Sequence, residues 1–176
     1  MLLIANHDIS IGAEITFSYE CSIKKTTQDR LFHLPLRGFE CNCQACSIPD
    51  VAAKLDKMVE LDATIFNLGS NGKIDRAIRV GKQLIKLYDK LRCPDISYSR
   101  TYYDLFQVAI SKRKTLKEGR YFIKKAYEHG SVFYADGDEH VNKFKKYMLN
   151  PEEHRNYRLN DWLRSNKTLS LIREWN

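Results

Sequence analysis

Residues 74–91 have the sequence IDRAIRVGKQLIKLYDKL, in which apolar and small side chains recur every three or four positions. This spacing places them along one face of an α-helix and leaves most of the charged residues on the other face. Just beyond lies Cys93-Pro94-Asp95, where the proline cannot continue a helix. The stretch therefore predicts an amphipathic helix whose core-facing residues are Ala77, Ile78, Gly81, Leu84, Ile85 and Tyr88.

The same periodicity extends to both sides of this stretch. It predicts helices over residues 51–68, 96–111, 116–129 and 141–149, separated by short polar or helix-breaking segments. Helices of similar length with short connections favour stacked antiparallel pairs. The pair 96–129 has the approximate length of one tetratricopeptide unit, so residues 51–160 predict an antiparallel, tetratricopeptide-like helical module. The tail at 161–176 contains both tryptophans, and the spacing of its apolar residues does not indicate which secondary structure it forms.

The first fifty residues have a different character. Residues 2–5 and 15–17 are apolar, β-branched or aromatic and predict short strands, and residues 10–12, ending in Gly12, predict a turn between them. Residues 20–50 are irregular, with one or two helical turns expected over 27–34. The predicted fold is therefore mainly α, with a short β element before the helical module.

Composition excludes several classes of protein. The chain has 176 residues, 43% of them apolar and 29% charged, which is typical of a soluble globular protein. No apolar run approaches the roughly 20 residues of a membrane span, and no signal peptide is evident, so we expect no membrane partner and an intracellular location, nuclear or cytoplasmic. The net charge of +7 is distributed over several helices among acidic residues. It favours a solvated surface over a specific nucleic-acid site, although a partner surface is the alternative.

Three of the five cysteines lie within the six residues Cys41-Asn42-Cys43-Gln44-Ala45-Cys46. Clustered, reduced thiols at this spacing favour a metal site, and zinc prefers thiolate ligands in a tetrahedral set of four. The alternative is three buried, inert thiols. Three local ligands leave one position for a fourth, and the spacing favours none of the candidates: His7, Cys21, His33 and Cys93.

Residues 8–19, DISIGAEITFSY, resemble the closing strand-turn-strand of SET-domain protein lysine methyltransferases, which usually has the form D-I-x-x-G-E-E-[IL]-x-[FIV]-x-Y. About twenty residues later that family has a C-x-C-x-x-C post-SET segment, which Cys41–Cys46 match. Leu31, Phe39 and Glu40 lie where SET–MYND-like and fungal members have R-x-x-L…F-x-C-x-C. The resemblance covers about residues 1–160 and is most specific over 8–46.

The resemblance implies roles for matched residues. Tyr19 corresponds to the catalytic tyrosine of the lysine channel, and Phe17 to the channel residue that tunes how many methyl groups fit. Cys41, Cys43 and Cys46 would hold a structural zinc ion, next to the pocket for the methyl donor S-adenosylmethionine. The implied substrate of the parent enzyme is a lysine of a protein, histone or non-histone.

Departures from the family pattern limit this assignment. The sequence has no G-x-G donor-binding segment and no N-H-S-C-x-P-N segment, and Ala13 replaces a glutamate of the turn. The expected organisation is the end of a SET domain at 1–20, a linker and post-SET zinc segment at 21–50, the helical module at 51–160 and a tail at 161–176. We therefore expect a fragment of a SET-type methyltransferase that is inactive alone. The alternative is a non-catalytic helical-repeat module that binds a peptide and carries a vestigial SET end.

Overall fold

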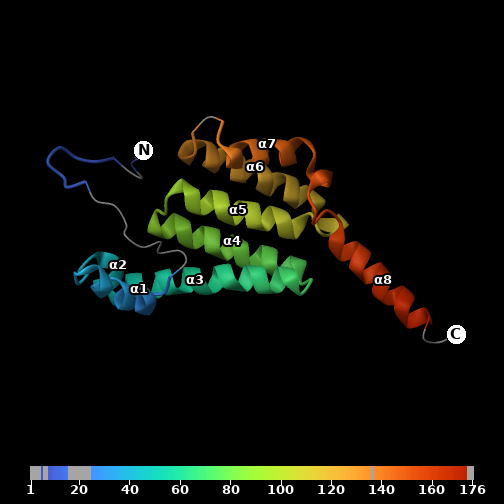
Figure 1. The fold of residues 1–176 in the computed structure, drawn as a ribbon, viewed down its shortest axis with the longest axis horizontal. Helices are drawn as coiled ribbons and strands as arrows, with labels where there is room; N and C mark the ends of the chain where they lie inside the picture. Colours follow the sequence, from blue (N-terminus) through green and yellow to red (C-terminus); the bar gives the residue numbers. More distant parts are fainter. Residues whose placement is uncertain (1–4, 6–7, 16–24, 136, 174–176) are drawn as a thin grey trace.

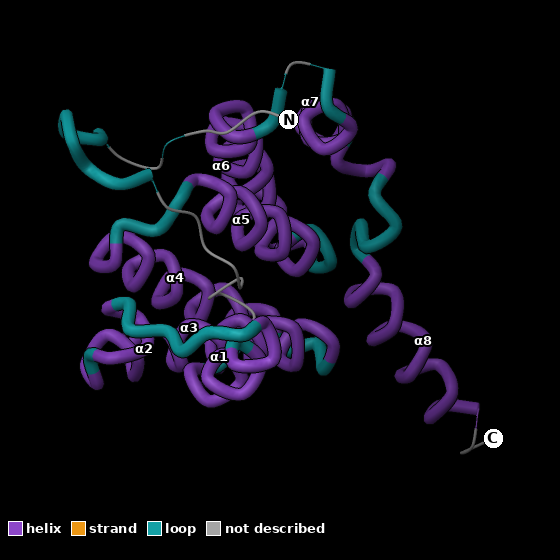
Figure 2. The backbone as a smooth tube through the Cα atoms, turned by 60° about the vertical axis from the view of Figure 1, so that its left-hand side comes forward, coloured by secondary structure: helices purple, strands orange, loops and turns teal. Residues whose placement is uncertain are grey.

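Helices make up nearly all the regular structure of the described residues, which are 5, 8–15, 25–135 and 137–173 of this computed structural model. Figure 2 shows no strand in this part of the chain. The prediction of a mainly α fold is thus confirmed. The predicted strands at 2–5 and 15–17 lie mostly outside the described residues, and Ala5 and Ile15, which lie inside, are not in strands. The elements are α1 (Thr27–His33), η1 (Pro35–Arg37), α2 (Gln44–Ser47), α3 (Pro49–Ser70), α4 (Ile74–Leu91), α5 (Asp95–Ala109), η2 (Arg113–Thr115), α6 (Leu116–Phe133), α7 (Glu139–Leu149), η3 (Pro151–Glu153) and α8 (Leu159–Arg173).

Helices α3 to α7 stack side by side in chain order, each antiparallel to the one before it (Figure 1). The short helices α1 and α2 pack against the first part of α3, at the end of the stack that also holds the cysteines. Helix α8 leaves the other end of the stack and extends away from it (Figures 1 and 2). The stack of antiparallel helices agrees with the predicted architecture of residues 51–149.

The predicted helix boundaries differ from the observed ones mainly at the ends. Helix α4 spans the predicted residues 74–91, whereas α3 begins at Pro49 and α6 continues to Phe133. Proline is favoured in the first turn of a helix, because its missing N–H has no partner there. Residues 161–173 of the tail, which the sequence left unassigned, belong to α8.

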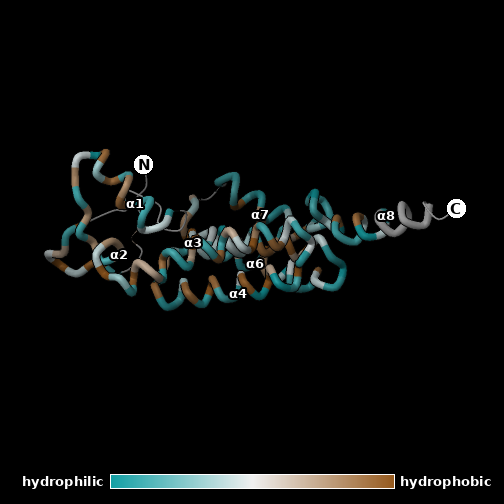
Figure 3. Tube along the Cα trace, turned by 90° about the horizontal axis from the view of Figure 1, so that it is seen from below, coloured by the Kyte–Doolittle hydropathy of each residue, from teal (hydrophilic) through white to brown (hydrophobic). Residues whose placement is uncertain are grey.

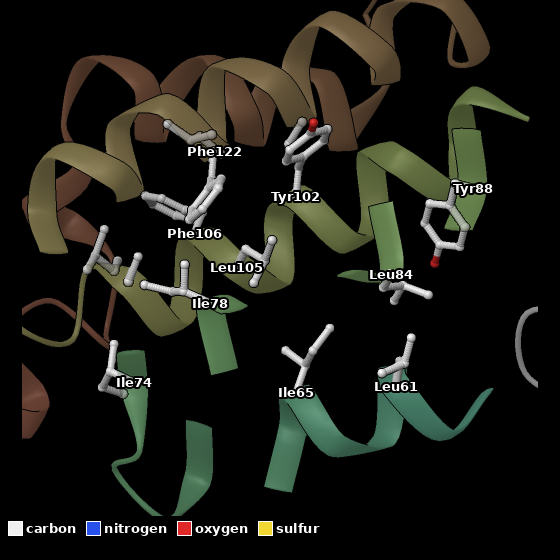
Figure 4. Close-up of a cluster of buried hydrophobic side chains, with 14 of the residues drawn as sticks. Leu61, Ile65, Ile74, Ile78, Leu84, Tyr88, Tyr102, Leu105, Phe106 and Phe122 are labelled. Atoms are coloured by element: carbon white, nitrogen blue, oxygen red, sulfur yellow. The ribbon is translucent and has the colours of Figure 1, made fainter. Parts of the chain in front are cut away.

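The core lies between the facing sides of these helices (Figure 4). The predicted inner face of α4 is buried except for Ile85, which is half-buried. Near the C-terminal end of α4, the hydroxyl group of Tyr88 hydrogen-bonds to Oγ1 of Thr101 over 2.9 Å, which satisfies two buried polar atoms. The largest fully buried apolar side chains are Met58, Leu84, Tyr88, Leu105, Phe106, Ile110, Phe122 and Ile123.

Apolar residues alternate with polar ones along the helices in Figure 3, as expected for helices with one buried face. No helix in the described ranges is long and apolar enough to cross a membrane. Near the N-terminus, the Ala13 N–H donates to the Ser10 carbonyl over 3.0 Å, and Gly12 has φ +85°. The turn predicted at residues 10–12 is therefore present, with glycine at the position that requires a left-handed backbone.

Candidate metal centre

The cysteine cluster is held between η1 and α3 by a short folded loop. Gly38 ends η1 with φ +85°, which turns the chain toward Cys41. Cys43 then begins α2, and its carbonyl accepts hydrogen bonds from the N–H groups of Cys46 and Ser47, both over 2.9 Å. Since residues three apart share one face of a helix, this turn brings the Cys43 and Cys46 side chains together.

The Sγ atoms of Cys41, Cys43 and Cys46 all lie within 4.8 Å of one another. In a tetrahedral zinc site with Zn–S bonds of about 2.3 Å, the sulfurs are about 3.8 Å apart, so small side-chain rotations bring this group to ligand distance. None of the three thiols is in a disulfide. Cys43 is exposed and the other two are half-buried, which leaves the cluster accessible to an ion. The donor set thus fits the metal that the sequence predicts.

The thiols also influence one another electrostatically. Burial alone raises the pKa of Cys43, but hydrogen bonds from the Cys41 thiol and from nearby backbone N–H groups outweigh it and lower that pKa. The pKa of Cys46 is raised, first by burial and then by its neighbouring thiols, although Arg30 acts to lower it. Of these two thiols, Cys43 is therefore the more ready to supply a thiolate, which is the form that binds metal.

One residue of this site was missed in the sequence. Arg30 of α1 is buried beside the cysteine loop and donates from Nη2 to the Ala45 carbonyl over 3.0 Å. Fifteen positions separate the two residues, so helical periodicity gives no indication of the contact. The only local signal was the Thr26–Asp29 capping box that starts α1.

The other predicted site residues are not part of the cluster in the described chain. Tyr19, Phe17, Cys21 and His7 lie outside the described residues. His33 lies at the end of α1 and is not in the group of metal-ligating atoms. Cys93, between α4 and α5, packs against the helical core, and burial raises the pKa of its thiol to about 11. Within the part of the chain that the structure describes, no His, Cys, Asp or Glu adds a fourth ligand to the three thiols.

A groove of about 1070 Å³ lies at the other end of the helical stack. It is bounded by the C-terminal half of α3, by α5 and by the start of α8, and residues of both charges line it. Phe66 lines its wall with 73% of its surface exposed, and Leu163 of α8 is 44% exposed. The cysteine cluster contributes no residue to this groove.

No family model, curated protein or solved structure matches this chain.

Proposed function

We propose that Cys41, Cys43 and Cys46 bind one structural zinc ion that orders the segment in front of the helical module. The observation that carries this proposal is the convergence of three free Sγ atoms within 4.8 Å. Thiolates favour zinc over the harder cations calcium and magnesium, which take oxygen ligands. Loop 38–48 has only the four-residue helix α2 as regular structure, and a metal ion would supply the cross-link that such a segment needs.

Elemental analysis tests this proposal directly. Protein purified without added metal should contain about one zinc per chain, and Cys43→Ala should lose most of it because two thiolates bind zinc weakly. The matched control is Cys93→Ala, which removes a thiol outside the cluster and should keep the zinc content. A folded, zinc-free chain whose stability is the same with and without Cys43 would refute the site.

We propose, more broadly, that the chain is part of a SET-type protein lysine methyltransferase. The support is the resemblance of residues 8–19 to the closing strand-turn-strand and the spacing of the three cysteines that follow. In this proposal Tyr19 aligns the substrate lysine, Phe17 shapes the channel, and S-adenosylmethionine supplies the methyl group to the parent enzyme. Binding of radiolabelled S-adenosylmethionine, to this chain and to a version extended upstream, tests the assignment.

A second candidate function is a non-catalytic interaction module of tetratricopeptide-like type. The groove beside α3, α5 and α8 favours it, because the exposed Phe66 ring offers apolar contact area to a peptide. Donor binding separates the two candidates. An upstream-extended chain that binds no S-adenosylmethionine would leave the interaction module as the better explanation.

A further inference from the structure

Arg30 is the one residue of α1 that is buried, and it is only 3% exposed. Arginine is rarely buried to this extent unless an acceptor or a negative charge compensates it. Its Nη1 donates to the Lys25 carbonyl over 2.9 Å, and its Nη2 donates to Thr27 Oγ1 over 2.9 Å and to the Ala45 carbonyl over 3.0 Å. All three acceptors are neutral, so they satisfy hydrogen bonds without balancing the charge.

The remaining guanidinium nitrogen, Nε, lacks even a neutral acceptor among the described residues. This nitrogen is buried, and no ion pair joins Arg30 to a described carboxylate. A buried positive charge without an anionic partner is costly. The guanidinium lies beside the cysteine loop, because its Nη2 atom bonds to the carbonyl of Ala45, the residue directly before Cys46.

Metal binding would change the charge of that neighbour. A divalent ion bound by three thiolates has a formal charge of −1, and a fourth thiolate makes it −2. The buried guanidinium would then lie beside an anionic group. In addition, its bond to Ala45 fixes the backbone between two of the ligands, Cys43 and Cys46.

We infer that Arg30 is a positioning residue of the metal centre: it fixes the Cys43–Cys46 turn through the Ala45 carbonyl, and its charge offsets that of the metal–thiolate group. This inference rests on the proposed zinc site. Groups that orient metal ligands typically change metal affinity by 10- to 100-fold when they are lost. Lysine cannot reproduce the forked geometry of the guanidinium, although it keeps the charge.

The test compares Arg30→Met and Arg30→Lys with Arg76→Met, a matched control at an exposed arginine of α4. Zinc affinity is measured by competition with a chromophoric chelator. We expect Arg30→Met to weaken zinc binding by about tenfold or more, Arg30→Lys to weaken it less, and Arg76→Met to leave it unchanged. Affinity in Arg30→Met equal to that of the unmodified chain overturns the inference. If Arg30→Met does not fold, unaltered affinity in Arg30→Lys overturns it instead.

Cobalt substitution separates a charge effect from a merely structural one. A nearby cation lowers the energy of the sulfur electrons, so its loss should move the sulfur-to-cobalt charge-transfer band of Arg30→Met to longer wavelength, and Arg30→Lys should restore most of the shift. An unmoved band with weaker binding means that Arg30 acts only on the fold of the loop and overturns the charge role. Absence of zinc from the unmodified chain overturns the proposed metal site and this inference together, whereas zinc binding by the unmodified chain with equal affinity in Arg30→Met overturns the inference alone.

Discussion

Gly81 of α4 lies so close to Leu105 of α5 that a Cβ atom at Gly81 would be 2.3 Å from Leu105 Cδ2, and 2.9 Å from its Cγ. Both residues are buried, and Leu105 has no exposed surface. The contact therefore needs a residue without a side chain at position 81. It sets how closely the first helical pair, α3 and α4, approaches the second, α5 and α6.

Gly81→Ala should destabilise the protein. Alanine favours a helix interior over glycine by about 0.5–1 kcal/mol, but forcing a methyl group into a filled core costs about 1–3 kcal/mol. Since Leu105 is enclosed on all sides, we expect the steric cost to exceed the helix gain and the free energy of unfolding to fall by about 1–2 kcal/mol. Urea denaturation measures this change.

Gln83→Ala is the matched control, because Gln83 is exposed on the same helix. Its effect should stay within about 0.5 kcal/mol. A double-mutant cycle with Leu105→Ala isolates the contact, since the smaller residue makes room for the added methyl. The double variant should be more stable than the sum of the single effects indicates. Additive effects would contradict the proposed steric conflict.

The free energy of unfolding should also fall at acidic pH because of His154. This imidazole is buried against the rings of Tyr103, Phe106 and Tyr147, and burial, reinforced by Arg155 and Lys143, lowers its pKa to about 4. The unfolded chain, with a histidine pKa of about 6.5, binds the proton more readily. The contribution of the neutral imidazole to stability is therefore complete above about pH 6.5 and is lost as the pH falls toward 4. Between about pH 7 and about pH 5, the free energy of unfolding should fall by about 2 kcal/mol.

Urea denaturation at the two pH values, on the unmodified chain and on His154→Gln, measures this contribution. Glutamine keeps a polar side chain that can replace the bond from the Asn156 N–H to Nδ1. It should remove most of the loss between the two pH values. His140→Gln, at a histidine whose side chain is 45% exposed, should retain it because His154 is intact. An equal loss in His154→Gln would assign the acid sensitivity to other groups.

The helical module could be predicted from sequence because its information is local. The apolar spacing of residues 74–91 fixes both the extent of α4 and its buried face, apart from the half-buried Ile85. The end of α6 was harder to predict. Gly130 weakens the helical pattern, yet the helix continues to Phe133. The glycine is explained by a tertiary contact, since a Cβ atom at position 130 would be 2.9 Å from Ser99 Oγ and 3.0 Å from the Phe144 ring.

The metal site, too, could be predicted from the sequence only in part. Cys41, Cys43 and Cys46 are close together in the sequence, and the structure brings their sulfur atoms together. Arg30 could not be found because its link to Ala45 depends on how α1 packs against α3, including the bond from the Thr27 N–H to Asp56 Oδ1 over 2.6 Å. Periodicity carries no information about such a tertiary contact.

Methyl transfer by residues 1–176 alone should be undetectable. Holding a methyl donor and a lysine amine in line contributes about 7–11 kcal/mol to catalysis, and the sequence lacks both donor-binding segments of the family that it resembles. A version extended upstream through such segments should be active and should lose most activity in Tyr19→Phe. Radiolabelled donor assays on protein arrays measure methyl transfer by the short chain and by the extended one. Transfer by the short chain contradicts the first expectation, and full activity of the extended Tyr19→Phe variant contradicts the role of Tyr19.

Zinc should protect the loop before α3 from proteolysis. Arg37 is an exposed trypsin site between α1 and the cysteines, in a segment with little regular structure, where local opening costs little free energy. A ligand that binds only the closed loop lowers the open population in proportion to its saturation. Cleavage after Arg37 should therefore be about tenfold or more faster with a chelator than with zinc.

The variants decide whether the three thiols cause this protection. Cys43→Ala should be cleaved quickly with or without zinc, whereas Cys93→Ala should keep the zinc dependence, because its thiol lies between α4 and α5 and not in the cluster. In every case the fragment that contains α3 to α7 should persist and give a helical circular dichroism spectrum, since its core is formed by those helices. Equal cleavage rates with and without zinc, in a chain that binds one zinc ion, would show that the metal leaves the loop as open as before and does not order the segment that leads into α3.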